Sequence, residues 1–152
     1  MLVKEILKIK GSTLFTASPA SPLSDSVVSM ADHDIGSLVV MDKGKFAGML
    51  TFREVLKVLA ARQKEARVGP TPTMMNIKVS DVMDSNPSIA TPDMEVDQLR
   101  QLMLEKHQRY VPVMEADTLL GVISFHDVAK AVLEEQSFEN RMLKGYIKDW
   151  PA

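Results

Sequence analysis

The sequence predicts an α+β fold of the α/β type, built from two tandem strand–helix–strand–strand–helix (βαββα) units related by a pseudo-twofold axis. The main observation is an internal repeat: Leu23–Leu59 aligns without a gap with Val96–Val132, at an offset of 73 residues (96 − 23 = 73). Identical pairs include Met41 and Met114, Gly48 and Gly121, and Phe52 and Phe125. Each copy of such a repeat is one supersecondary unit that buries its apolar face against its twin, and a cleft between related units is a common ligand site.

Composition narrows the class of protein. The chain has 152 residues, of which 45% are hydrophobic, which is enough for one sizeable core. Its 18 basic and 20 acidic residues give no broad attraction to nucleic acid or anionic lipid. Cysteine is absent, and the three histidines lack the spacing of a helical metal pair, so neither thiol chemistry nor a metal site is expected.

No apolar run approaches the roughly 20 residues that cross a bilayer, and charges interrupt the start of the chain where a signal peptide would be apolar. We therefore expect a soluble protein in the cytoplasm.

The first repeat opens with a short extended segment, Leu14–Thr16, and a turn-rich stretch. Leu23, Val27, Met30 and Ala31 then recur at helical spacing, which predicts an amphipathic helix with a buried stripe.

Two strands and a second helix follow. Ser37–Met41 is β-branched, Asp42–Lys45 has the composition of a hairpin turn, and Phe46–Leu50 is the expected partner strand. Thr51 begins a helix that is predicted to reach about Arg62.

The second repeat predicts the same order of elements. These are an extended segment at Ser88–Ala90, a helix from Val96 to about Lys106, strands Tyr110–Met114 and Leu119–Ile123, and a helix from Ser124.

The predicted boundaries are a first repeat at 1–62, a polar, proline-broken linker at 63–78, a second repeat at 79–135 and a helical tail at 136–152. The prefixes Val3–Leu7 and Val79–Met83 also resemble each other. In the tail, Phe138, Met142 and Trp150 belong to one apolar helical face. Since the helices carry more apolar surface than one small core needs, we expect a homodimer.

The duplicated motifs resemble the CBS domain pair, or Bateman module. They are Ser37–Asp42 with Gly48–Glu54, Tyr110–Glu115 with Gly121–Asp127, and residues 90–93. The resemblance covers nearly the whole chain. It implies a module that binds adenine nucleotides in clefts between its repeats, forms disc-shaped dimers and acts as an energy or cofactor sensor.

Thr51 with Glu54, and Ser124 with Asp127, have two interpretations. By spacing alone, each pair is a capping box, in which an acid closes back onto the N-cap amide. The resemblance instead implies that the Ser124 hydroxyl lies beside a phosphate and that Asp127 holds both ribose hydroxyls. Glu54 is one methylene longer than the family's aspartate, so we expect the first copy's site to be empty or altered.

The resemblance implies further residues that line the nucleotide site. The adenine edge would meet Thr13, Leu14 and Phe15, the phosphates would face Gly36, Ser37, Arg109 and His126, and the base would be flanked by Ile123. The alternatives are a core role for Phe15, a solvated surface role for Arg109, and an exposed first-turn position for His126.

The sequence thus predicts a stand-alone regulatory module that binds AMP, or a related nucleotide (ADP, ATP or NAD), and signals through an unknown effector protein. The alternative is a structural or dimerising module with degenerate sites. An enzyme is not expected, and neither is a catalytic cofactor, because the chain shows no nucleophile–base set, metal constellation or Walker-type loop. Nucleic acid and membranes are not expected as partners.

Overall fold

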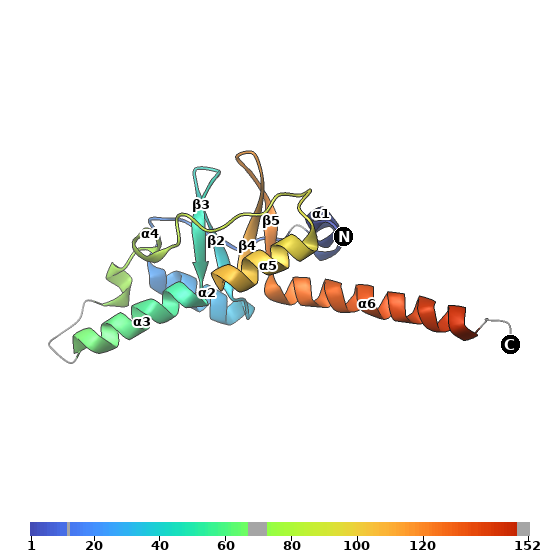
Figure 1. Ribbon diagram of the computed structural model, residues 1–152. Coiled ribbons are helices and arrows are strands. Elements are labelled where there is room, and N and C mark those ends of the chain that lie inside the picture. Colours follow the sequence, from blue (N-terminus) through green and yellow to red (C-terminus); the bar gives the residue numbers. More distant parts are fainter. Residues whose placement is uncertain (12, 67–72, 149–152) are drawn as a thin grey trace.

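The computed structural model describes residues 1–11, 13–66 and 73–148, with the side chains of residues 147 and 148 left out (Figure 1). Within this part, the predicted α+β fold of two repeats is confirmed. The first half of the chain forms α1 (Val3–Lys10), β1 (Thr16–Ala17), α2 (Leu23–His33), β2 (Ser37–Asp42), β3 (Lys45–Thr51) and α3 (Phe52–Ala66). The second half forms η1 (Met74–Asn76), α4 (Val79–Val82), α5 (Val96–Lys106), β4 (Tyr110–Glu115), β5 (Thr118–Ser124) and α6 (Phe125–Lys148).

Several elements differ from the sequence prediction. Helix α3 continues to Ala66, into the predicted linker. The segment predicted as a strand at Ser88–Ala90 makes only an isolated bridge between Ala90 and Val113. The predicted tail is continuous with α6; Trp150 lies outside the described residues.

The strands form two small sheets that repeat the same pairing. β1 pairs parallel to β2, which pairs antiparallel to β3, and β4 pairs antiparallel to β5. The register shifts between Val40 and Met41 in one hairpin and between Val113 and Met114 in the other, which are aligned positions of the repeat. Figure 1 shows the two hairpins side by side with their turns at the same end, while α3 and α6 diverge to opposite sides.

The two prefixes are exchanged between the repeats. Val3 and Ile6 of α1 are buried in the core of the second repeat, together with Leu99 of α5. Val79 of α4 is buried in the core of the first repeat, together with Leu23 of α2. The exchange ties the halves together, and it brings the end of α1 to the start of α6.

Gly48 of β3 accommodates one of these crossings. Met49 N donates to Asp84 O at 2.9 Å, and Asp84 N donates to Met49 O at 2.8 Å. A Cβ atom at Gly48 would lie only 2.5 Å from the Asp84 carbonyl oxygen. The strand therefore needs glycine here for the backbone that follows α4 to approach.

Candidate functional site

The start of α6 is held by a reciprocal pair of hydrogen bonds. Ser124 N donates to Asp127 Oδ2 at 2.8 Å, and Asp127 N donates to Ser124 Oγ at 3.0 Å. This is the capping box that the spacing predicts, and it fixes the Asp127 carboxylate over the first turn of the helix. The capping box does not exclude a contact with ribose, because one carboxylate can both cap a helix and bind a ligand.

The start of α3 is capped differently. Glu54 Oε1 accepts hydrogen bonds from both Thr51 N, at 2.8 Å, and Thr51 Oγ1, at 2.9 Å. The Thr51 hydroxyl also accepts from Arg53 N at 3.2 Å. The longer glutamate thus accepts two hydrogen bonds from its N-cap residue, Thr51. The shorter Asp127 accepts only one from its N-cap residue, from the Ser124 amide.

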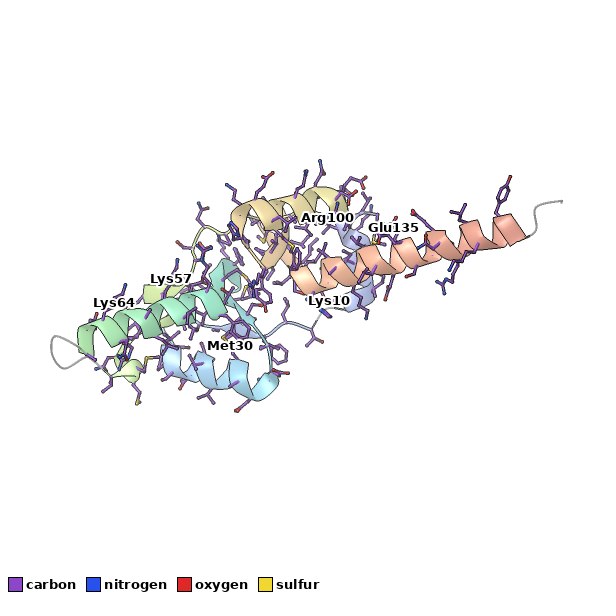
Figure 2. The ribbon with its side chains drawn as sticks, turned by 60° about the horizontal axis from the view of Figure 1, so that its bottom comes forward. Lys10, Met30, Lys57, Lys64, Arg100 and Glu135 are labelled. Atoms are coloured by element: carbon purple, nitrogen blue, oxygen red, sulfur yellow. The ribbon has the colours of Figure 1, made fainter. Side chains whose placement is uncertain are left out.

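Lys10, at the end of α1, reaches into the start of α6 from the other half of the chain (Figure 2). Its Nζ lies 2.7 Å from Asp127 Oδ2 and 2.8 Å from the carbonyl oxygen of Val122. Lys10 was not among the site residues predicted from the sequence. No local spacing marks it, since the contact depends on the exchange of the prefixes.

The ion pair determines the charge of the site. Burial raises the pKa of Asp127, but the Lys10 ammonium and the two hydrogen bonds with Ser124 outweigh burial, so the net shift is downward. The Asp127 carboxylate is only 20% exposed, while the Lys10 side chain is 37% exposed. Asp127 is therefore ionised at neutral pH and partly shielded from water.

Gly36 and Arg109 are aligned positions of the repeat, and the main-chain carbonyl of each accepts a hydrogen bond from the first residue of α3 or α6. Gly36 O accepts from Phe52 N at 3.2 Å, and Arg109 O accepts from Phe125 N at 2.7 Å. The side chain of Arg109 is exposed, and its charge lowers the pKa of the neighbouring Tyr110.

Tyr110 connects the two repeats at this site. A Cβ atom at Gly36 would overlap its hydroxyl group. Burial raises the pKa of Tyr110, Arg109 lowers it and Asp127 raises it, with a net upward shift. Tyr110, which pairs with Ser124 in the β4–β5 hairpin, therefore lies between Gly36 and the start of α6. It was not among the site residues predicted from the sequence.

The remaining predicted residues lie in different surroundings. Thr13, Leu14 and Phe15 are exposed. The ring of Phe15 packs on His33 with 4.6 Å between centroids, so Phe15 is not a core residue. Ser37 is half-buried at the start of β2, and His126 is exposed in the first turn of α6.

Ile123 differs from the other predicted site residues because it is fully buried in the core of the second repeat. Its side chain packs in this core and presents no surface to a base.

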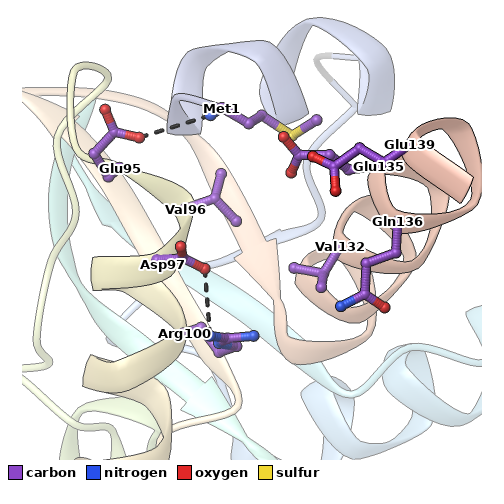
Figure 3. Close-up of a pocket in the computed structure, with 9 residues that line it drawn as sticks. All are labelled: Met1, Glu95, Val96, Asp97, Arg100, Val132, Glu135, Gln136 and Glu139. Atoms are coloured by element: carbon purple, nitrogen blue, oxygen red, sulfur yellow. Dashed lines mark ion pairs between the residues drawn. The ribbon is translucent and has the colours of Figure 1, made fainter. Parts of the chain in front are cut away.

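Two cavities lie elsewhere. One of about 320 Å³ lies between the start of α5 and the middle of α6 (Figure 3). Among its lining residues are Glu95, Arg100 and Glu139. A smaller one, of about 130 Å³, is lined by residues of β1 and α2, including Thr16 and Ser26. Neither of these two is lined by Asp127 or Glu54.

In the described part of the chain, no group of three or more histidine, aspartate and glutamate side chains is arranged to hold a metal ion. Among the same residues, no helix is long and apolar enough to cross a membrane.

Comparison with known proteins gives consistent matches. The model of the CBS domain family matches residues 3–61 and 79–134. The mitochondrial CBS domain-containing protein CBSX3 of Arabidopsis thaliana is 27% identical over 155 aligned residues, covering 96% of this chain and 71% of CBSX3.

Solved structures of CBS-domain proteins share the fold. The CBS-domain containing protein ATU1752 from Agrobacterium tumefaciens superposes with a TM-score of 0.75 at 30% identity, covering 86% of this chain and 98% of that one. CBSX2 in complex with AMP superposes with a TM-score of 0.67 at 21% identity, covering 81% of this chain and 90% of that one. At that identity, the second match concerns the fold alone.

Proposed function

The chain belongs to the CBS domain family, and from this premise we propose that it is a regulatory module that binds an adenosine nucleotide, with AMP as the preferred ligand. ADP, ATP and NAD share the adenosine group and are the next candidates. In this proposal the ligand binds at the start of α6, and its occupancy is passed to an effector protein. CBSX2, a protein with the same fold, is solved in complex with AMP, and for this reason we place AMP first among the candidates.

The geometry of Asp127 is the observation that carries the proposal. The Asp127 carboxylate accepts hydrogen bonds from the main-chain amide of Ser124 and from Lys10 Nζ, and both donors bind the same oxygen, Oδ2. Within the described residues, Oδ1 accepts no hydrogen bond. A fixed carboxylate with a remaining acceptor suits the two adjacent hydroxyls of a ribose, and charge-assisted hydrogen bonds of this kind are strong.

The same place also suits a phosphate. The first turn of α6 presents main-chain amides and the positive end of the helix dipole. The main-chain carbonyl of Arg109 accepts from Phe125 N, two residues before Asp127, so the exposed Arg109 side chain starts beside the first turn of α6. We therefore assign Ser124, His126 and Arg109, with Gly36 and Ser37, to the phosphate side. Thr13, Leu14 and Phe15 remain the proposed adenine wall.

The first copy of the site is proposed to be empty. Oε1 of Glu54 takes both donors of Thr51, so the side chain is folded into its cap. Its extra methylene changes where a ribose would have to lie. We infer one nucleotide per chain.

We further propose a homodimer formed through α3 and α6. Part of the expected surplus of exposed apolar helix surface is absent. Four apolar residues of α2 and α5 are buried in the core: Leu23, Met30, Leu99 and Met103. Many of the exposed apolar side chains lie instead on α3 and α6, the last helix of each repeat. They include Phe52 (58% exposed), Leu56 (66%), Leu59 (51%) and Leu133 (62%). A twofold contact between such faces is the commonest way to cover them.

One observation favours the alternative, a structural or dimerising module with degenerate sites. Lys10 already neutralises Asp127 and takes part of its hydrogen-bonding capacity. In either case the role is regulatory or structural rather than catalytic. A cytoplasmic location stays a prediction.

Thermal unfolding with and without nucleotide separates the two functions, because a ligand that binds only the native state raises the midpoint. AMP, ADP, ATP and NAD are compared at equal concentrations with inorganic phosphate as the control. We expect AMP to raise the midpoint most. No shift with any of the four would favour the structural module.

A further inference from the structure

We propose that Lys10 makes this site select phosphorylated ligands over the unphosphorylated nucleoside. The inference rests on the proposed nucleotide site and names the residue that determines its specificity. Lys10 comes from α1, outside the strand–helix motifs that carry the family resemblance.

The ammonium group of Lys10 occupies a position that a ribose hydroxyl needs. Its Nζ lies at hydrogen-bonding distance from Asp127 Oδ2 and also binds the Val122 carbonyl oxygen, at 2.8 Å. One ribose hydroxyl can bind the open Oδ1, but a second hydroxyl that binds Oδ2 must displace Nζ, because Oδ2 already accepts from both Ser124 N and Lys10 Nζ. Binding of both hydroxyls therefore requires the loss of two hydrogen bonds of Lys10.

A phosphate compensates for this loss, whereas a nucleoside does not. The displaced ammonium remains on a flexible four-carbon stem at the edge of the site, where it needs a new acceptor. A ligand phosphate supplies a charged acceptor within the same site, and such bonds are about twice as strong as neutral ones. Adenosine breaks the ion pair of Lys10 and supplies no anion in return.

The position of α1 keeps Lys10 at the site after displacement. Val3 and Ile6 are buried in the second repeat, so the helix is fixed there. Lys10 is its last residue, and its side chain is 37% exposed. The side chain can thus turn from the carboxylate to a neighbouring anion while the helix stays in place.

Calorimetry with AMP and adenosine on Lys10→Met tests the proposal. The matched control is Lys8→Met, which removes the same charge from an exposed position in the last turn of the same helix. In Lys10→Met, we expect adenosine to bind about threefold more tightly and AMP about threefold more weakly, so that the preference for AMP falls roughly tenfold. Lys8→Met should keep the preference of the unmodified chain.

Several outcomes would overturn the proposal. Unchanged affinities in Lys10→Met would mean that Lys10 only fastens α1, and an equal tightening of both ligands would mean that it only competes with the ribose. An unmodified chain that binds AMP and adenosine equally well would refute the role of Lys10 but leave the nucleotide site intact. If it bound neither, the proposed function itself would fail, and this inference with it.

A second measurement needs no variant, in case Lys10→Met does not fold. Salt screens the partly exposed pair of Lys10 and Asp127 as well as any contact with phosphate. Raising the ionic strength from about 0.05 M to about 0.5 M should strengthen adenosine binding to the unmodified chain and weaken AMP binding. A parallel response of the two ligands would contradict the proposal.

Discussion

Gly36 and the hydroxyl group of Tyr110 are in direct contact across the two repeats, so closely that Gly36 has no room for a side chain. A methyl group there would also lie 2.6 Å from the ring of Phe52. Gly36→Ala should therefore destabilise the fold by about 1–3 kcal/mol, the usual cost of overpacking.

Urea unfolding of Gly36→Ala measures this cost. Adding Tyr110→Ser, the residue found at the aligned position 37, should recover part of it, because the exposed Phe52 ring can turn away. The control is Gly145→Ala in α6, which meets open space and should be neutral or stabilising by up to about 1 kcal/mol. Equal effects of the two alanine substitutions would contradict the contact.

The lowered pKa of Asp127 predicts a particular response to acid. Burial raises this pKa, but the bonds from Lys10 and Ser124 lower it below its usual value of 3.8. The stabilisation of the ionised group is therefore complete above that value and is lost as the pH falls through the lower, folded-state pKa. Lys10→Met should raise the folded-state pKa of Asp127, so the stabilisation should be smaller and its loss should be complete at a higher pH.

Carboxyl NMR titration of Asp127 in the unmodified chain and in Lys10→Met measures both values. Lys8→Met, which removes the same charge from an exposed position in the same turn, is the matched control and should leave the Asp127 titration unchanged. An Asp127 titration that is identical in the unmodified chain and in Lys10→Met would show that the ion pair does not form in solution.

The proposed dimer predicts a mass in solution of about twice 16.9 kDa. Leu56→Lys, in the exposed face of α3, should give a monomer by light scattering at micromolar concentration, because a charge would then have to be buried in the interface. Ile9→Lys is the matched control, since Ile9 is 75% exposed on α1, outside the proposed interface.

Truncation after Glu135 tests the contribution of the tail to this dimer. Because Phe138 and Met142 continue the exposed apolar surface of α6, their removal should weaken the dimer. An unmodified chain that is monomeric at micromolar concentration would refute the interface on α3 and α6.

Much of the fold was predictable from the sequence. The helix predicted from Val96 to about Lys106 is observed with those bounds. The strand predicted at Ser37–Met41 extends one residue further at its end, and the strand predicted at Phe46–Leu50 extends one residue further at both ends. These elements were predictable because apolar periodicity and turn residues are local signals.

The exchange of α1 and α4 between the repeats was not predictable in the same way. Val3 and Val79 mark helices with buried faces, but their spacing does not say which core buries them. Lys10 and Tyr110 were missed in the site for this reason, since both contacts arise between distant segments. The Ser124–Asp127 pair was found because its geometry is local.

The asymmetry between the two copies predicts the binding stoichiometry. With Glu54 folded onto Thr51, the unmodified chain should bind about one AMP. Glu54→Asp shortens the side chain to match Asp127 and should raise the stoichiometry toward two, as measured by calorimetry. Two equal sites in the unmodified chain would show that one methylene does not distinguish the copies.

Asp127 is proposed to bind the ligand and not merely to cap α6. This role is tested most directly by AMP calorimetry on Asp127→Ala beside Glu54→Ala, with urea unfolding of both. Each variant removes the acid of one capping box and should lose about 1 kcal/mol of stability. We expect Asp127→Ala to abolish AMP binding and Glu54→Ala to retain it. Unchanged AMP affinity in a folded Asp127→Ala protein would contradict this role and leave Asp127 as a cap alone.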